Sequence, residues 1–371
     1  FVLSFPAGEL SRWKGQHETL LGYEWSAYRM RYNATSAAAG TDDLFASSRQ
    51  PSAASLYVDH TVRTGRFSAR AGLRGETVTG TGWTGLSPRV SIKWFANRDL
   101  AFTIAGGATS QWTPALRNEQ APVRVFDFWL TSDRFTPVAR AWQEIAGVER
   151  WFGVSRFVRV EGWHKTYSQL PATNLRDDPD VPGDEFIVTT GRSFGLDVLL
   201  RQLESERLSG WLAYSFGVSR RTGPDGDFAP VQDRRHNLNL VASFRPGGKW
   251  NYGARLGFGT GTPFTDIVGQ IVRRRYDPLG NTFESGSLDQ QLEPIGGIRN
   301  GARFPVFQRL DLSVTREGTG RLHWSPYLSL INAYNANNVF TYAFDYAKNP
   351  PTRTTFSQFP FLPTAGVKVS W

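Results

Sequence analysis

Apolar and polar residues alternate along most of this chain, and residues 361–371 show the pattern most clearly. In an extended segment Ala365, Val367 and Val369 fall on one side, whereas Lys368 and Ser370 fall on the other. The same period of two recurs at 87–96 and 250–260. Because one side of a strand in a transmembrane barrel meets lipid and the other faces the lumen, this alternation predicts barrel strands.

About fifteen segments follow this pattern, and none has a sustained helical period. The strand at 1–10 is the weakest of them. The clear strands are predicted at 20–32, 55–63, 67–78, 87–96, 100–110, 138–150, 157–167, 191–202, 208–220, 236–245, 250–260, 304–316, 321–334 and 361–371.

The connections between these strands alternate in length. Short ones fall at 64–65, 97–98, 152–154, 203–206, 246–248 and 317–320, and most of those between them are long: 34–54, 111–137, 170–190, 261–303 and 335–360. Transmembrane barrels have short periplasmic turns and longer extracellular loops. We therefore predict an all-β fold, an antiparallel up-and-down transmembrane β-barrel, as one domain over residues 1–371. The pattern turns eight residues to lipid, namely Val90, Ile92, Trp94, Leu310, Leu312, Val314, Val367 and Val369, and turns Arg309, Asp311 and Lys368 inward.

Composition supports this prediction. Hydrophobic residues make up only 40% of the 371 residues, and no apolar run reaches the roughly 18 residues of a spanning helix, which excludes a helical membrane protein. Aromatic residues make up 14%, enough for a girdle at headgroup level near the short turns. Its expected members are Phe67, Trp94, Phe95, Trp151, Phe157, Phe244, Trp250, Trp324 and Trp371.

The charged and reactive residues argue against nucleic-acid binding and catalysis. The net charge of +9 is scattered at alternate positions and does not form a basic stripe. Cysteine is absent, which excludes disulfides and thiolate chemistry. The five histidines are dispersed, and for His236 a hydrogen bond in the lumen or at the rim is favoured over a catalytic role. The acidic stretch 177–185 lacks calcium-loop spacing. We predict no enzyme, no cofactor and no metal site.

Two long loops carry aromatic residues beside arginines, a combination that suits stacking on sugar or catechol rings and pairing with anionic groups. Packing between the loops is the alternative role. The predicted ligand-binding residues are Trp112, Arg117, Arg124, Phe126 and Trp129 in the first loop and Arg273, Arg274 and Tyr276 in the second.

Several stretches, taken in order, resemble the barrel of TonB-dependent outer-membrane receptors of the class with a carboxypeptidase-regulatory-like N-terminal extension. They are residues 86–90 (LSPRV), 210–215 (GWLAYS), 233–239 (DRRHNLN), 259–265 (GTGTPFT), 309–313 (RLDLS), 330–335 (LINAYN) and 361–367 (FLPTAGV). The resemblance implies a bacterial outer-membrane receptor that takes up a siderophore, corrinoid, oligosaccharide or peptide. Its partners would be TonB, membrane lipid, lipopolysaccharide and the nutrient.

Barrels of this family close with about 22 strands around a plug. An odd count of fifteen sends the first and last strands in the same direction, so we expect an unclosed seam between them, with the plug and the first strands absent from these residues. A self-contained porin-like channel is the alternative, and an outer-membrane barrel enzyme is a remote one.

Overall fold

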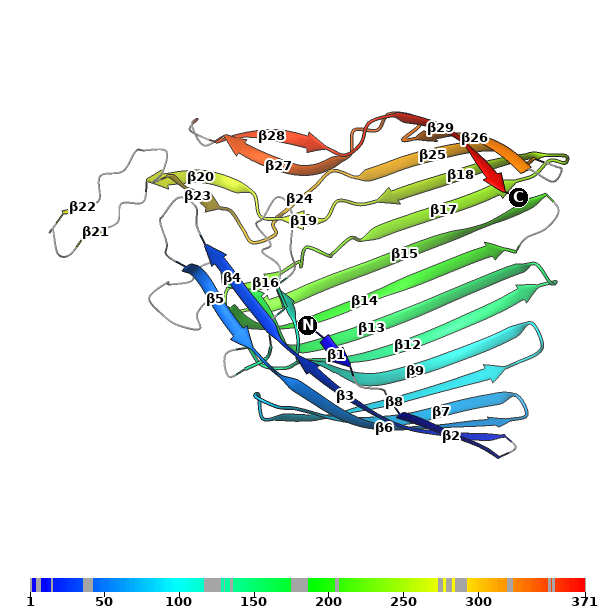
Figure 1. Ribbon diagram of the computed structural model, residues 1–371, viewed down its shortest axis with the longest axis horizontal. Helices are drawn as coiled ribbons and strands as arrows, with labels where there is room; N and C mark the ends of the chain where they lie inside the picture. The colour runs from blue at the N-terminus through cyan, green and yellow to red at the C-terminus, as the bar shows by residue number, and fades with distance from the viewer. Residues whose placement is uncertain are drawn as a thin grey trace.

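A computed structural model describes the backbone of most of the chain (Figure 1). Side chains are described over a smaller set, which leaves out 1–15 and 32–47. The described backbone comprises residues 2–4, 8–14, 16–35, 43–116, 128–129, 131–133, 136–174, 186–203, 207–272, 276–277, 282–283, 292–318, 323–345, 348 and 351–370.

One large antiparallel sheet of 17 strands forms a curved wall. Two of its strands are short. β1 (Val2–Ser4) pairs with the same edge of β3 as β2 does, and among the described residues β16 (Gly226–Phe228) pairs only with the end of β15. The wall strands, in spatial order, are β2 (Gly8–Lys14), β3 (His17–Tyr28), β6 (Ser52–Thr64), β7 (Phe67–Val78), β8 (Trp83–Phe95), β9 (Leu100–Gln111), β12 (Ala139–Phe152), β13 (Arg156–Thr173), β14 (Phe186–Gln202), β15 (Leu208–Gly223), β17 (His236–Phe244), β18 (Trp250–Gly259), β25 (Phe307–Arg316), β26 (His323–Ile331) and β29 (Leu362–Ser370). This order confirms the predicted up-and-down topology.

Small strand pairs extend the wall at the end that carries the long loops (Figure 1). Apart from residues 30–32 of β4, which belong to the strand predicted at 20–32, they occupy stretches outside the predicted strands, so the loop end is more ordered than predicted. The pairs are β4 (Met30–Thr35) with β5 (Asp43–Arg49), β10 (Ala115–Leu116) with β11 (Phe128–Trp129), β19 (Pro263–Phe264) with β24 (Ala302–Arg303), β20 (Ile267–Val272) with β23 (Leu292–Gly296), β21 (Tyr276–Asp277) with β22 (Thr282–Phe283), and β27 (Val339–Asp345) with β28 (Thr352–Ser357).

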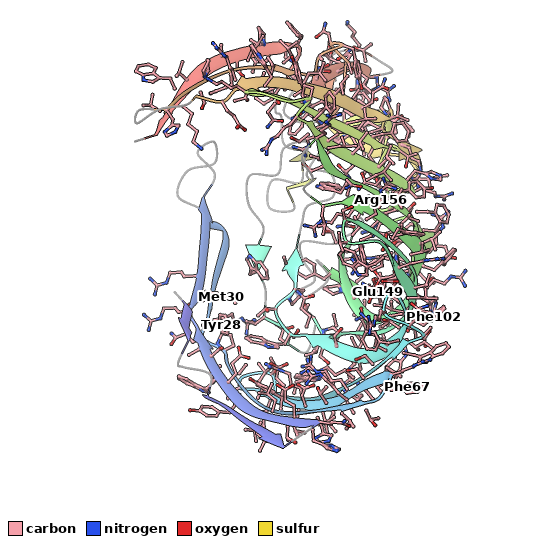
Figure 2. The ribbon with its side chains drawn as sticks, turned by 90° about the vertical axis from the view of Figure 1, so that its right-hand side faces the viewer. Tyr28, Met30, Phe67, Phe102, Glu149 and Arg156 are labelled. Atoms are coloured by element: carbon pink, nitrogen blue, oxygen red, sulfur yellow. The ribbon has the colours of Figure 1, made fainter. Side chains whose placement is uncertain are left out.

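The sheet does not close. Among the described residues, β1 and β2 pair only with β3, and β29 pairs only with β26, so no ladder joins the first strand to the last. Viewed along the wall, the sheet forms an open arc (Figure 2). The predicted unclosed seam is confirmed.

The two faces of the wall differ in chemistry. Figure 2 shows Phe67 and Phe102 on the convex outer side and Glu149 on the concave inner side. Trp94 pairs directly with both of these phenylalanines, so it shares their face, and Val90 and Ile92 share its parity. Following the paired positions from Phe102 to β25 puts Leu312 on the outer face too, where 38% of its surface is exposed. The predicted register is confirmed.

The aromatic girdle is narrower than predicted. Phe67, Trp94 and Phe102 form a stack on the outer face, with ring centroids 6.4 and 5.4 Å apart. Phe95, Trp151 and Phe157 have the parity of Glu149 and therefore belong to the inner face. The reason is that aromatic residues cluster near turns on both faces of the sheet, whereas only outward ones can reach headgroups.

A small hydrophobic cluster lies inside the arc near the loop end. It contains Ala53, Val78, Trp112 and Val138, and the ring of Tyr28 meets that of Trp112 edge-on at 5.2 Å. Many large apolar side chains are exposed on the outer wall, among them Leu56 at 70% and Ile104 at 69%. Such exposure suits lipid as the surrounding medium and not a folded core. No helix among the described residues is long and apolar enough to cross a bilayer.

A buried asparagine fixes the turn after β26. Asn332 is 0% exposed and has a φ of 53°, in the left-handed region. Its side chain donates to the carbonyl oxygens of Ala336 (2.9 Å) and Phe359 (3.2 Å) and accepts from the amide of Ala336 (2.8 Å). The turn is therefore tied to the segment that leads into β29.

We expect Asn332→Ala to lower the free energy of unfolding by about 2 kcal/mol, because it leaves buried partners unsatisfied and strains the backbone. Asn332→Gly removes the same hydrogen bonds without the strain and should cost less. Guanidinium unfolding of the receptor in detergent measures both. Equal losses in the two variants would show that the left-handed backbone contributes nothing.

Candidate ligand-binding site

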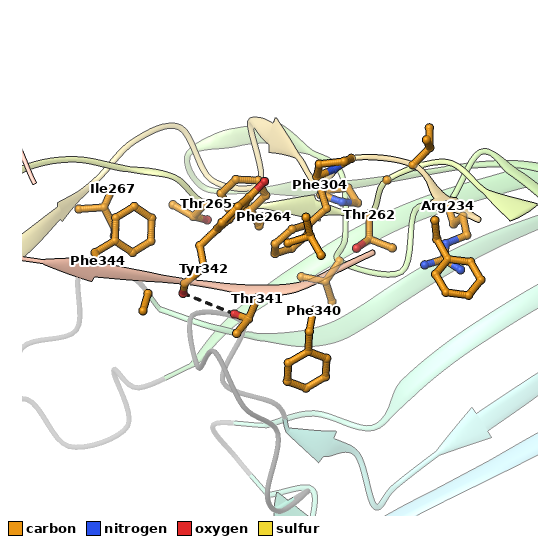
Figure 3. Close-up of a pocket in the computed structure, with 18 of the residues that line it drawn as sticks. Arg234, Thr262, Phe264, Thr265, Ile267, Phe304, Phe340, Thr341, Tyr342 and Phe344 are labelled. Atoms are coloured by element: carbon orange, nitrogen blue, oxygen red, sulfur yellow. Dashed lines mark hydrogen bonds between the residues drawn. The ribbon is translucent and has the colours of Figure 1, made fainter. Parts of the chain in front are cut away.

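A cavity of about 730 Å³ lies at the loop end, where three strand segments meet. β19 and the residues beside β24 supply one side, and β27 supplies the other (Figure 3). It is lined by Val231, Arg234, residues 261–265, Ile267, Pro294, Gly296, residues 304–307, residues 339–344 and Gln358. A volume of this size suits a small molecule of several hundred daltons.

Aromatic rings form one wall of this cavity. The centroid of Phe264 lies 4.4 Å from that of Phe304 and 5.4 Å from that of Tyr342, and Phe304 and Tyr342 stack at 5.2 Å with an interplanar angle of 18°. Such faces favour stacking with flat rings or with the apolar faces of sugars.

Cationic groups lie beside the rings. The guanidinium of Arg353 sits 4.2 Å from the centroid of Tyr342, and its Nη1 is 3.7 Å from Oδ2 of Asp266. The guanidinium of Arg234 lies 6.0 Å from the ring of Phe307. A planar guanidinium on an aromatic wall suits an anionic planar ligand.

A buried ion pair holds the backbone around the cavity. Asp233 has a side chain that is 0% exposed, pairs with Nη2 of Arg303 and accepts a hydrogen bond from the amide of Ser219 at 2.7 Å. The same guanidinium donates through Nη1 to the carbonyl oxygens of Asp233 (2.8 Å) and Gly261 (2.9 Å). One arginine thus joins the segments before β17, after β18 and in β24, which fixes the floor of the cavity.

A second polar region lies on the inner face of the wall and contains a cavity of about 420 Å³. Nε of Arg89 donates to Asp59 at 2.9 Å, and Nε of Arg70 donates to the same oxygen at 3.2 Å. The carboxylate of Asp59 is only 3% exposed. Nη2 of Arg74 bonds Glu24 at 3.0 Å and Glu76 at 3.2 Å. These inward charges are therefore paired, as suits a polar lumen.

The predicted ligand residues have different environments. Trp112 is 7% exposed and packs in the cluster described above, whereas Trp129 is 48% exposed. Tyr276 pairs with Phe283 through its backbone, and its side chain lies outside the described set. Arg117, Arg124, Phe126, Arg273 and Arg274 fall outside the described residues, as does the acidic stretch 177–185. Their binding role stays a prediction.

The residues of the loop-end cavity were missed by sequence reasoning, although two signals pointed to them. Phe264 belongs to the motif at 259–265, and Arg234 to the motif at 233–239. Tyr342 and Arg353 lie in the loop 335–360, where no residue was singled out.

No metal-binding grouping is found in the part of the chain that the structure describes. No group of three or more His, Asp or Glu side chains there could hold a metal ion. Nδ1 of His236 and the hydroxyl oxygen of Tyr214 form a hydrogen bond of 2.9 Å, whose donor depends on the histidine tautomer. Both residues have outer-face parity, so the hydrogen bond lies on the outer wall and not in the lumen, whereas its predicted place at the rim stays a prediction.

A family model described as "TonB dependent receptor-like, beta-barrel" matches residues 3–339. No curated protein matches the chain. Among solved structures, the unliganded ferric citrate transporter FecA is 13% identical with a TM-score of 0.60, and the alignment covers 98% of this chain and 53% of that one. The Pseudomonas aeruginosa ferripyoverdine receptor bound to ferripyoverdine is 11% identical with a TM-score of 0.61, covering 96% and 46%.

A third similar structure is the FrpB iron transporter from Neisseria meningitidis, 13% identical with a TM-score of 0.58, covering 98% of this chain and 53% of that one. The chain spans about half the length of these structures. At such identities the likeness shows the fold alone.

Proposed function

Because the chain belongs to the TonB-dependent receptor β-barrel family, whose members lie in the bacterial outer membrane, we propose that it forms barrel wall and ligand site of a receptor for TonB-coupled uptake of a scarce nutrient. The loop-end cavity carries this proposal. It lies at the end of the long loops, which faces the outside of the cell in such barrels.

The chemistry of the cavity favours one class of ligand. The stacked aromatic rings, the lining residue Arg234 and the guanidinium of Arg353, which lies over the ring of Tyr342, suit an anionic chelate with flat groups, such as a ferric siderophore, better than a neutral sugar. The solved structures named above, a ferric citrate transporter, a ferripyoverdine receptor and an iron transporter, agree with that class. TonB, lipid and lipopolysaccharide complete the proposed partners, with TonB bound by other parts of the receptor.

A passive channel is supported less well. Such a channel needs a closed sheet, and in the described part of the chain β2 and β29 have no shared ladder. Enzymatic activity has no support from the family, whose characterised role is transport.

The test removes the aromatic wall and its cation together. In the receptor that contains this chain, Tyr342→Ala with Arg353→Gln should weaken binding of ferric enterobactin or ferric citrate by roughly tenfold or more, because stacking and charge pairing are both lost. Equilibrium binding to whole cells measures this.

The matched control is Phe356→Ala. Phe356 is an exposed aromatic residue on the same hairpin, pairs with Thr341 through the backbone, and does not line the cavity. It should leave binding within twofold. Equal effects of the two changes, or unchanged binding of both chelates in the double variant, would contradict the proposed site.

A further inference from the structure

Two arginines face each other directly on the outer wall. Arg192 on β14 and Arg220 on β15 are a cross-strand pair, and Thr166 on β13 is the other neighbour of Arg192. Arg192 is exposed, and Arg220 is partly exposed. Like charges placed directly opposite each other destabilise a sheet unless an anion lies between them.

The pair lies on the lipid-facing side. Arg192 has the parity of Phe194 and Leu196, whose side chains are 48% and 41% exposed. The paired positions Phe102, Val148, Val160 and Val198 connect this face to the convex side that Figure 2 shows. The arginines therefore point away from the lumen and from any ligand there.

The positions of the two arginines along β14 and β15 give their height in the membrane. The outer face of β14 is apolar from Leu200 to Phe194, and Arg192 comes next, ten residues from the turn-end residue Gln202. At about 3.3 Å per residue and a tilt of about 40°, that is about 25 Å, the height of the apolar band of such barrels. On β15, Arg220 likewise follows the outward residues Tyr214, Phe216 and Val218. Both guanidiniums thus lie at the extracellular border of the apolar band.

Neither guanidinium forms an ion pair with a carboxylate among the described residues. Glu144, one row closer to the turns, accepts from Nε1 of Trp142 at 2.8 Å and contacts Nδ1 of His164 at 3.3 Å. The carboxylate of Glu144 is therefore already bound by these two partners, and it lies two strands away from Arg192. Within the described residues, the site therefore has two cations without a carboxylate partner, and the hydroxyl of Thr166.

We propose that Arg192 and Arg220 bind a phosphate of a lipopolysaccharide headgroup in the outer leaflet. The phosphate would accept charge-assisted hydrogen bonds from both guanidiniums, which relieves their repulsion. The acyl chains would lie on the apolar face below, along Phe194 and Phe216. Lipid is the occupant because the pair directly borders the apolar band, where a soluble anion has no apolar contact to make.

The proposal depends on the outer-membrane location of the barrel and not on the transported ligand, so its failure leaves the uptake function untouched. The variant is Arg192→Gln with Arg220→Gln in the receptor that contains this chain. The matched control is Arg150→Gln with Arg156→Gln, which removes two exposed outward arginines near the turn end of neighbouring strands.

Native mass spectrometry in detergent would measure binding of bisphosphorylated lipid A and of its dephosphorylated form. We expect the unmodified receptor to favour the phosphorylated form by roughly tenfold or more, and the variant to lose that preference while the control retains it. Arg192→Lys with Arg220→Lys should restore part of the preference, which separates lost charge from misfolding.

Three results would overturn the proposal. One is an unmodified receptor that binds both forms equally, as it would if acidic residues outside the described set neutralise the pair. Another is a Gln variant that keeps the full preference. The third is complete displacement of lipid A by inorganic phosphate at equal concentration, which would make the site one for a free anion.

Discussion

Asp233→Ala is expected to lower the free energy of unfolding by about 3 kcal/mol. Removing one partner of a buried ion pair costs about 3 to 5 kcal/mol because the other charge loses its counter-ion. The low end applies because the side chain of Arg303 is 33% exposed and can reach water. The amide of Ser219 also loses its acceptor. The midpoint of guanidinium unfolding in detergent micelles measures the loss.

Asp99→Ala is the matched control, because Asp99 is an exposed acid in a tight turn and its side chain makes no described ion pair. It should change the stability by less than about 0.5 kcal/mol. The Asp233 change should also weaken ferric-chelate binding, since Arg303 holds the cavity floor. If the Asp233 variant had normal stability, the electrostatic gain of the ion pair would only equal the cost of desolvating its two charges.

Leu312→Arg is expected to cost about 2 to 4 kcal/mol of stability in a bilayer. Leu312 lies on the outer face of β25, between the outward residues Leu310 and Val314, so a guanidinium there would sit in the apolar band. Folding titrations into lipid vesicles measure the difference.

The neighbouring change Ser313→Arg places the same side chain on the inner face, where it can extend into water. It should cost far less, although Gly253 lies opposite and brings its backbone close to the Ser313 hydroxyl. If both substitutions cost the same, or Ser313→Arg costs more, the assignment of the two faces is wrong.

The strands of the wall could be predicted because the sequence pattern that specifies each strand and turn lies within a single short segment. Alternation from Val90 to Trp94 predicts the face of each residue in turn. The turn at Gly65–Arg66, one residue beyond the predicted 64–65, depends only on its own residues, with Gly65 at a φ of 53°. The small hairpins at the loop end were missed because β4 and β5, or β27 and β28, are too short for alternation to stand out from irregular sequence.

The ligand cavity was harder to predict for a different reason. Phe264, Phe304 and Tyr342 come from three segments that meet only after the wall has folded. Their proximity is a property of the long-range fold, and no spacing in one chain segment encodes it. Composition could show that aromatic residues and arginines crowd the loops, but not which of them meet.

The inner ion pairs also bear on the shape of the sheet. Arg89 on β8 reaches Asp59 on β6 across the intervening strand, and a Cβ on Gly72 of that strand would lie 2.1 Å from the carboxylate oxygen. Arg74 reaches Glu24 across β6 in the same way. Bonds between alternate strands shorten the inner surface relative to the outer one. Each of these bonds spans three neighbouring strands, so the curvature of the wall is fixed locally. The sheet can therefore keep its curvature although it is not closed.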